Sequence, residues 1–425
     1  MEQDTAAPLS CCRRQYLTAG CFAGAMLAES GAARPARLCS RRAKRLTRCE
    51  LPAAEKAPPP TRRGALLGAA SMAASLAVAR PVVAASPAGS AARVAAAVAA
   101  TTTTIGATRV SAVGAGTWQF GNKLLWNYDP AQDGELRACF DELLSGSDRV
   151  FIDTADSYGT GKLEGRAETL LGQFAASSPR GERAFIATKL APYPSRITPS
   201  AFVDAAKASL LRLQRSSVDV VQAHWSVSNY APWQESALLD GLADIYAAGL
   251  AGGVGLSNYG PKQLRKAHAR LAARGVPLVS AQVQYSLLSL APETSGLREA
   301  CDELGIRLIA YSPLCLGALT GKYEAGGVLP PGPRGLLLGS LLKDATPLLG
   351  LLRELAAAHG ATPAQVAINW CRAKGALPIP GSRTVAQARD ARACLGWSLA
   401  AGEVEELDKA ASRCKGTVQN SFQTA

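Results

Sequence analysis

The chain has 425 residues, 48% of them hydrophobic and 19% charged, so it can bury a large core. Its net charge of +13 is uneven, because residues 1–104 carry 14 Lys and Arg against 5 Asp and Glu, leaving 32 against 28 in the remainder. A basic excess confined to one terminal segment argues against nucleic acid as a partner of the body of the chain.

The first predicted unit, residues 1–104, is rich in Ala, Arg and Ser and has no helical or strand periodicity. It resembles a plastid transit peptide, and we expect it to be disordered; an ordinary disordered tail is the alternative. Arg62 and Arg63 precede an apolar stretch, residues 64–79, that resembles a thylakoid-transfer signal ending at a small-residue cleavage site, residues 77–79. This stretch is too short for a membrane span of ~20 residues, so we expect chloroplast targeting without stable membrane insertion, to the stroma rather than the lumen.

The second predicted unit, residues 105–425, alternates apolar strand-like runs with amphipathic stretches of helical spacing. One such stretch, 197–214, begins with Thr198 as a helix cap and Pro199 in the first turn. Eight alternating units predict a single (β/α)8 TIM barrel. An open doubly wound sheet is the alternative, but no GxGxxG follows the first strand. The strand-like runs are 109–116, 150–155, 184–190, 218–225, 252–259, 278–285, 306–314 and 376–382.

Polar residues stand at the ends of three successive predicted strands. Asp153 and Tyr158 follow the second strand, Lys189 ends the third and His224 lies near the end of the fourth. Each alone has an ordinary structural explanation, such as a surface lysine or a core histidine. Because active sites of this barrel gather at the C-terminal ends of the strands, we expect the four side chains to converge.

These four residue types suit the protonation of a carbonyl oxygen. A phenol with an unperturbed pKa of ~10 is a reluctant proton donor at neutral pH. A nearby ammonium stabilises the phenolate, and a buried carboxylate keeps that ammonium charged. A histidine beside the phenol can orient the substrate oxygen or relay a proton.

The motifs DTADSY, ATKL and QAHW, which contain Asp153, Tyr158, Lys189 and His224, resemble the catalytic tetrad of the aldo-keto reductase family. The resemblance continues through residues 114–121, 311–323, 359–370 and 379–390, and is greatest with the plant and algal chloroplast branch. It implies an NADPH-dependent oxidoreductase that reduces a small-molecule aldehyde or ketone, with Tyr158 as general acid. The family also implies a monomer.

The resemblance further implies a cofactor extended across the barrel mouth. Ser257, Asn258 and Gln282 would hold the nicotinamide carboxamide, and Tyr311 would stack on the ring. The segment 314–322 would run along the pyrophosphate, beside a surface loop at 325–335. The full implied set is Ser257, Asn258, Gln282, Tyr311, Ser312, Leu314, Gly317, Lys322, Gly381, Ser382, Arg383, Gln387 and Asp390.

Arg383 and Ser382 are placed to take the 2′-phosphate of NADPH, since a guanidinium and a helix N-terminus both bind phosphate well. Relatives often have Lys at the position of Arg383, and an Asn where this chain has Ala391, which leaves Gln387 and Asp390 for the adenine. For the substrate pocket we expect Trp118, Trp126 and Trp225, which favour an aromatic or apolar carbonyl compound.

A second class of function stays open, because the same barrel and cofactor also occur in regulatory subunits that sense NADP redox state. Slow turnover with retained cofactor would distinguish such a sensor from an enzyme. No metal site is expected: the six cysteines after residue 104 form no CxxC, and no histidine lies at ligand spacing from them. Residues 317–321 miss the spacing of a phosphate-binding GxxxxGK loop.

Overall fold

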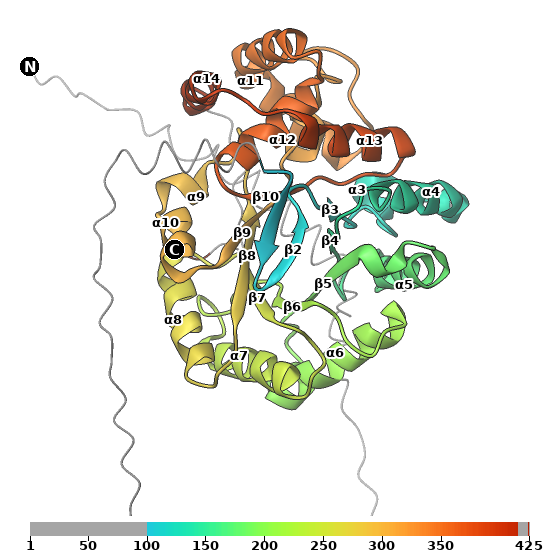
Figure 1. Ribbon diagram of the computed structural model, residues 1–425, viewed down its shortest axis with the longest axis vertical. Coiled ribbons are helices and arrows are strands. Elements are labelled where there is room, and N and C mark those ends of the chain that lie inside the picture. Colours follow the sequence, from blue (N-terminus) through green and yellow to red (C-terminus); the bar gives the residue numbers. More distant parts are fainter. Residues whose placement is uncertain (1–99, 415–423, 425) are drawn as a thin grey trace, which may run out of the picture. The chain divides into compact units, whose positions relative to one another are not determined.

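Eight parallel strands form the centre of the protein. The computed structural model describes residues 100–414 and residue 424, and the sheet pairs each strand with its neighbours in chain order (Figure 1). The first and last strands also meet, because Gly114 and Gly116 donate backbone hydrogen bonds to Pro378 (2.9 Å) and Pro380 (3.1 Å). The predicted TIM barrel is therefore confirmed, and the open doubly wound sheet is excluded. The strands are β3 (Ala115–Gly116), β4 (Val150–Asp153), β5 (Ala184–Leu190), β6 (Val220–Ala223), β7 (Val254–Ser257), β8 (Leu278–Gln284), β9 (Arg307–Tyr311) and β10 (Leu377–Ile379).

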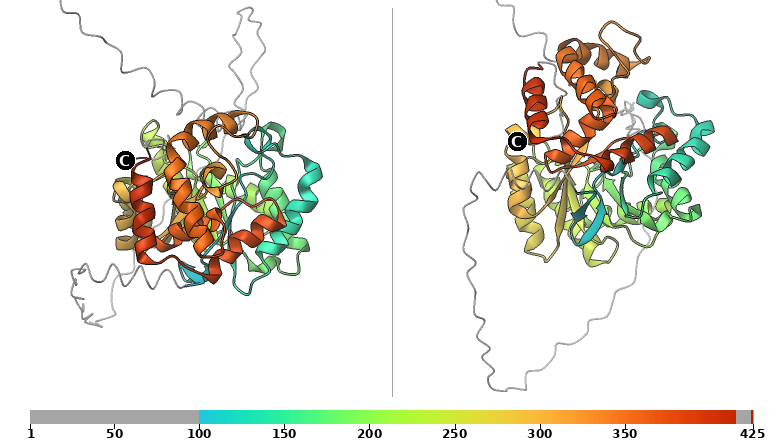
Figure 2. Two further views of the ribbon diagram at one scale, coloured as in Figure 1. Left: turned by 90° about the horizontal axis from the view of Figure 1, so that it is seen from above. Right: turned by 45° about the horizontal axis from the view of Figure 1, so that its top comes forward.

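Helices surround this sheet (Figures 1 and 2). The predicted cap of one of them is confirmed, since Thr198 accepts a hydrogen bond from the N–H of Ala201 and Pro199 stands in the first turn. The helices are α3 (Lys123–Trp126), α4 (Asp133–Leu143), α5 (Arg166–Ser177), α6 (Pro199–Leu213), α7 (Pro232–Ala247), α8 (Pro261–Ala272), α9 (Ala291–Thr294), α10 (Leu297–Leu304), α11 (Pro333–Ala358), α12 (Pro363–Ala373), α13 (Val385–Ala393) and α14 (Ala401–Ser412).

A two-stranded hairpin precedes the barrel and corrects two predictions. β1 (Thr102–Ile105) and β2 (Thr108–Ser111) pair around Gly106, so the predicted strand 109–116 is two strands, β2 and β3, in different sheets. The predicted boundary after residue 104 was also wrong, because it falls inside β1. Residues 102–104 belong to the folded body, because they pair with β2 and because the neighbouring Ile105 is buried. The targeting prediction for residues 1–99 lies outside the described residues.

The hairpin closes one end of the barrel. Ile105 and Val110 are buried in one apolar cluster with Phe151, Phe185 and other strand residues. Ser111 donates its N–H to the carbonyl of Arg149, directly before β4, so the hairpin covers the N-terminal ends of the strands. The opposite end, where the strands finish, is left for a site.

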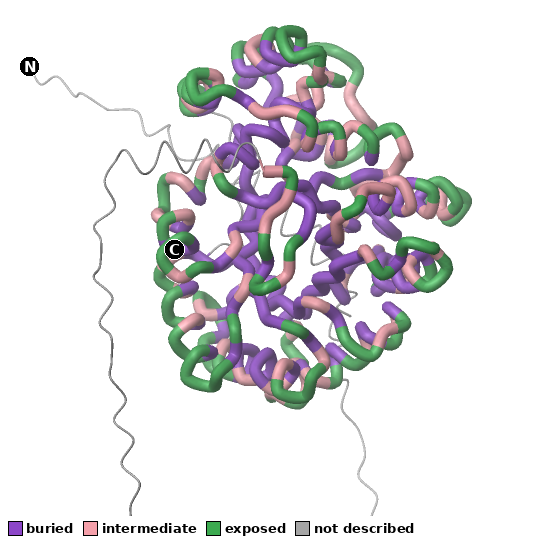
Figure 3. The backbone as a smooth tube through the Cα atoms, in the orientation of Figure 1, coloured by how far each residue is buried: buried purple, intermediate pink, exposed green. Residues whose placement is uncertain are grey.

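The central strands are buried while the outer faces of the helices meet solvent (Figure 3). Within the described part of the chain, one helix, α11, is long and apolar enough to cross a membrane, judged by length and composition alone. Its leucines at 338, 341, 342, 348, 349, 352 and 355 are buried. Packing inside the protein therefore accounts for these seven leucines, whereas Leu336 in the same helix is 81% exposed.

The loop expected at 325–335 ends earlier than predicted, because Pro333 starts α11 with Gly332 as its N-cap. Among residues 100–414, six cysteines are buried and unpaired, and no group of His, Cys, Asp and Glu is arranged to hold a metal ion.

Candidate active site

The four polar residues predicted from the strand ends lie together. The Nζ atom of Lys189 is 2.9 Å from the hydroxyl oxygen of Tyr158 and 2.8 Å from Oδ2 of Asp153. All of these side chains are nearly or fully buried, at 7% exposure or less. They meet because β4 and β5 are adjacent and parallel, which brings their C-terminal ends to the same edge.

Asp153 and Lys189 form a buried ion pair whose remaining polar atoms are also engaged. The ammonium of Lys189 donates a third hydrogen bond to the carbonyl of Thr154 (2.9 Å), and Oδ1 of Asp153 accepts one from the amide of Gln282 (2.7 Å). Burial lowers the pKa of Lys189, an effect that the negative charge of Asp153 opposes. The ammonium is therefore held in place by three acceptors, yet burial makes its proton easier to release.

His224 stands beside the phenol as a neutral imidazole. Its ring centroid is 5.7 Å from that of Tyr158, and its Nδ1 atom is 3.2 Å from the hydroxyl of Ser157. Burial, and then the positive charge of Lys189, lower the pKa of His224 well below its usual value. An uncharged ring hydrogen-bonded at Nδ1 is suited to orienting a carbonyl oxygen through Nε2.

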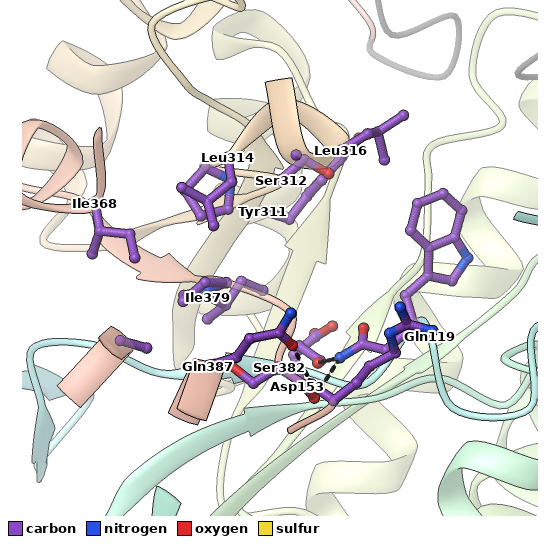
Figure 4. A pocket seen from close by; sticks show the side chains of 18 of the residues that line it. Gln119, Asp153, Tyr311, Ser312, Leu314, Leu316, Ile368, Ile379, Ser382 and Gln387 are labelled. Carbon is purple, nitrogen blue, oxygen red and sulfur yellow. Dashed lines mark hydrogen bonds between the residues drawn. The ribbon is translucent and has the colours of Figure 1, made fainter. Parts of the chain in front are cut away.

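These residues form one end of a cavity of about 380 Å³ at the C-terminal ends of the strands. All thirteen residues expected to bind the cofactor line this cavity, as do Trp118 and Trp126. In Figure 4, Tyr311, Ser312 and Leu314 lie on the opposite side of the pocket from Ser382 and Gln387. Trp225, expected in the pocket, is absent from the lining among the described residues; its indole N–H donates to the hydroxyl of Tyr230 (2.6 Å).

The polar groups of Ser257 and Asn258 in the cavity lining suit the binding of an amide group. The hydroxyl oxygen of Ser257 is buried and has no hydrogen-bond partner within residues 100–414 and 424, which leaves a donor and acceptor for a ligand. Asn258 and Tyr311 stand beside it, joined by a 3.0 Å hydrogen bond from the phenol to the amide oxygen. Gln282 was expected to hold the carboxamide, but its side-chain amide already donates a hydrogen bond to Asp153.

The segment after β9 curves around the cavity with unusual backbone angles. Ser312, Cys315 and Leu316 have φ values of 50°, 47° and 56°, and Gly317 has 102°. The left-handed conformation costs a non-glycine residue about 1–3 kcal/mol and is typical of ligand-binding loops. This segment contains the short helix η4 (Cys315–Thr320), in the stretch expected to follow a pyrophosphate.

Two guanidinium groups line the cavity beside Trp126. Arg383 donates to the backbone carbonyl of Trp126 (2.9 Å), and Arg334 stacks on the Trp126 ring at 4.6 Å. Burial, and then the positive charge of Arg334, lower the pKa of Arg383. Two cations that repel each other at a cavity wall favour a bound anion.

The two polar residues expected at the adenine end are held by protein groups. Gln387 accepts from the N–H of Arg383 (2.8 Å), and Asp390 accepts from Thr362 (3.0 Å) and from Gln365 (2.7 Å). Both still contribute to the cavity lining. Gln387 therefore also holds the loop that carries Arg383, and Asp390 joins α13 to the start of α12.

Sequence reasoning missed Arg334 and Gln119. Arg334 lies in the first turn of α11, in a stretch interpreted as a surface loop, and reaches the cavity between Trp126 and Tyr323. Gln119 donates to the carbonyls of Gly116 (2.9 Å) and Ser382 (3.0 Å), tying the loops after β3 and β10 together. The only sequence signal for Gln119 was its position shortly after the first barrel strand, where active-site loops begin.

The fold and the site define a TIM barrel with a phenol, ammonium, carboxylate and imidazole at its C-terminal mouth, in a cavity that two arginines also line. The sequence profile of the Aldo/keto reductase family matches residues 112–412. The chain belongs to this family.

Relatives with curated names include two reductases. The chain is 49% identical over 325 residues to a chloroplastic pyridoxal reductase of Arabidopsis thaliana, covering 75% of this chain and 88% of the relative. It is 31% identical over 281 residues to the L-glyceraldehyde 3-phosphate reductase of Escherichia coli K12, covering 62% and 77%.

A solved thermostable aldo-keto reductase, bound to the inhibitor epalrestat, matches with a TM-score of 0.58 at 26% identity, over 73% of this chain and 99% of that one. The glycerol dehydrogenase of Gluconobacter oxydans shares the fold, with a TM-score of 0.59 at 23% identity over 76% and 99%.

Proposed function

We propose that the protein is an NADPH-dependent reductase of aldehydes or ketones, with Tyr158 as the proton donor. The observation that carries this proposal is the Lys189 ammonium, which lies within 2.9 Å of both the Tyr158 hydroxyl and the Asp153 carboxylate at one end of the cavity. An ammonium at this distance stabilises the phenolate that remains after the proton leaves.

The chain's own residues divide the work as follows. NADPH supplies the hydride. Tyr158 donates its proton to the carbonyl oxygen, and neutral His224 orients that oxygen beside the phenol. Asp153 holds the ammonium of Lys189 against Tyr158. The burial of these four side chains lowers the local dielectric, which strengthens their electrostatic contacts.

The cavity supports NADPH as the cofactor. The Ser257 hydroxyl and Asn258 are in place for the carboxamide, and the curved segment containing η4 for the pyrophosphate. Arg383 and Arg334, which line the cavity beside Trp126, provide positive charge for a phosphate. The 2′-phosphate of NADPH would bind there, and NADH has no equivalent group.

Pyridoxal is the first substrate to test, since the Arabidopsis relative is named for its reduction. It is an aromatic aldehyde, and Trp118 and Trp126 line the cavity with two rings in edge-to-face contact, 6.3 Å apart. The experiment follows loss of NADPH absorbance by the full chain with pyridoxal, with a panel of other aldehydes and ketones, and with an NADH control.

Rapid NADPH-dependent loss of the carbonyl supports the reductase. Tight NADPH binding without turnover on any member of the panel would overturn it in favour of a redox-sensing subunit. Failure to bind NADPH would overturn both functions.

We also propose that the protein acts in the chloroplast stroma. The composition of residues 1–104 and the chloroplastic relative support this placement. Residues 1–104 fused to a fluorescent protein should direct it to plastids in plant or algal cells. Fluorescence confined to the thylakoid lumen, or left in the cytosol, would contradict the stromal placement.

A further inference from the structure

Thr424, the last but one residue of the chain, is bonded to the loop that follows β7. Its backbone N–H donates to the carbonyl of Asn258 (3.1 Å), and its hydroxyl oxygen accepts from the N–H of Gly260 (2.9 Å). Thr424 is only 5% exposed. These two hydrogen bonds hold both ends of the segment 258–260.

Asn258 needs such support because of its backbone and its neighbours. Its φ value of 64° is left-handed, a conformation that asparagine adopts more readily than most residues other than glycine but that still costs energy. Its side chain joins two strand ends, since Nδ2 donates to the carbonyl of His224 (3.0 Å) and Oδ1 accepts from the hydroxyl of Tyr311 (3.0 Å). A shift of the Asn258 backbone would therefore move a side chain that lines the cavity.

The backbone N–H of Gly260 also needs a hydrogen-bond acceptor. It is the N-cap of α8, and its N–H is the group that a Glu or Gln side chain in the first turn satisfies in a capping box. Here the hydroxyl of Thr424 accepts that hydrogen bond from a residue 164 positions away in the chain. The C-terminal end thus completes the start of α8.

We propose that Thr424 is a positioning residue for the nicotinamide half of the cofactor. It does not line the cavity itself, and it acts by holding the backbone of Asn258 so that the amide side chain meets the carboxamide. The inference rests on the proposed NADPH-dependent function. It predicts that Thr424 affects the binding of the nicotinamide half of the cofactor and leaves the binding of the adenine half unaffected.

The test compares two ligands that share the adenine half. NADPH carries the nicotinamide, whereas adenosine 2′,5′-bisphosphate lacks it. Dissociation constants are measured for the full-length wild type and for Thr424→Val, which removes the hydroxyl. NADPH should bind about three- to tenfold more weakly to the variant, the effect of one lost hydrogen bond, while the bisphosphate binds equally to both.

Two further variants sharpen the result. Thr424→Ser keeps the hydroxyl and should restore NADPH binding. Thr424→Pro removes the backbone N–H that reaches Asn258, and should weaken NADPH at least as much as Thr424→Val, again without affecting the bisphosphate.

Thr198→Val is the matched control, because Thr198 also accepts a backbone hydrogen bond at the start of a helix but lies outside the cavity lining. It should lower the melting temperature and leave both dissociation constants unchanged. If the Thr424 variants behave like Thr198→Val, or weaken both ligands equally, the positioning role is wrong. A wild-type protein that binds the bisphosphate but not NADPH would overturn the proposed function and this inference together.

Discussion

The ammonium of Lys189 lies 2.9 Å from the phenol oxygen of Tyr158 and at the same time 2.8 Å from a carboxylate oxygen of Asp153. The phenol therefore faces a fixed positive charge, and its hydroxyl also lies 3.5 Å from the Asp153 carboxylate that holds this charge in place. This arrangement makes Tyr158 the side chain whose proton the site is built to release.

Tyr158→Phe removes the proton donor together with the hydroxyl's hydrogen bonds to Lys189 and Asp153, and keeps the ring. Carbonyl turnover should fall by a factor of ~100 or more, which is the usual contribution of a general acid. The dissociation constant for NADPH should stay the same, since the ring is retained. Stopped-flow turnover and a fluorescence titration measure the two quantities, and unchanged turnover would remove Tyr158 from the mechanism.

Ser257→Ala tests the cofactor site through an atom that the described residues leave unsatisfied. Because the hydroxyl has no partner among them, its removal should change the free energy of unfolding by about 0.5 kcal/mol or less. NADPH should nevertheless bind about three- to tenfold more weakly, as expected for one lost hydrogen bond. Denaturant unfolding measures the stability, and a binding titration measures the affinity for NADPH. Lower stability with unchanged binding would show that Ser257 has only a structural role.

Arg383→Ala tests the phosphate end. A hydrogen bond to a charged group contributes about 1.5–3 kcal/mol, so NADPH should lose roughly tenfold or more in affinity while NADH changes little. Arg353→Ala is the control, because Arg353 pairs with Glu324 on the surface and lies outside the cavity lining. An equal loss for both cofactors would rule out recognition of the 2′-phosphate by Arg383.

The burial of His224 leads to a prediction about how the free energy of unfolding depends on pH. Burial depresses its pKa in the folded protein, so on acidification the unfolded chain takes up a proton that the folded chain does not. The contribution of His224 is thus fully present above the unfolded value of ~6.5, and stability falls below that pH by up to about 1.4 kcal/mol per pH unit.

The measurement compares unfolding free energies between pH 7.5 and pH 5 for the wild type and His224→Asn. The variant should lose less stability across this range, because the proton uptake by residue 224 in the unfolded state is gone. Parallel pH profiles for the two proteins would show that His224 is not held neutral in the fold.

Periodicity was enough to predict the barrel, because each parallel strand buried on both faces reads as a short apolar run and each helix as an amphipathic one. The same reading explains why Asp153, Lys189 and His224 were found, since they interrupt apolar runs at strand ends. It failed at residues 109–116, where a hairpin strand and a barrel strand are separated by only three residues and have the same composition.

Other features depend on contacts between residues far apart in the chain, which no local pattern encodes. Arg334 reaches the cavity only because α11 begins next to Trp126. Thr424 meets Asn258 because the end of the chain returns to β7. The sequence by itself thus determined the barrel and the chemistry at its strand ends, through hydrophobic periodicity and residue type. The tertiary structure alone decided which distant side chains complete the cavity, because those depend on packing geometry.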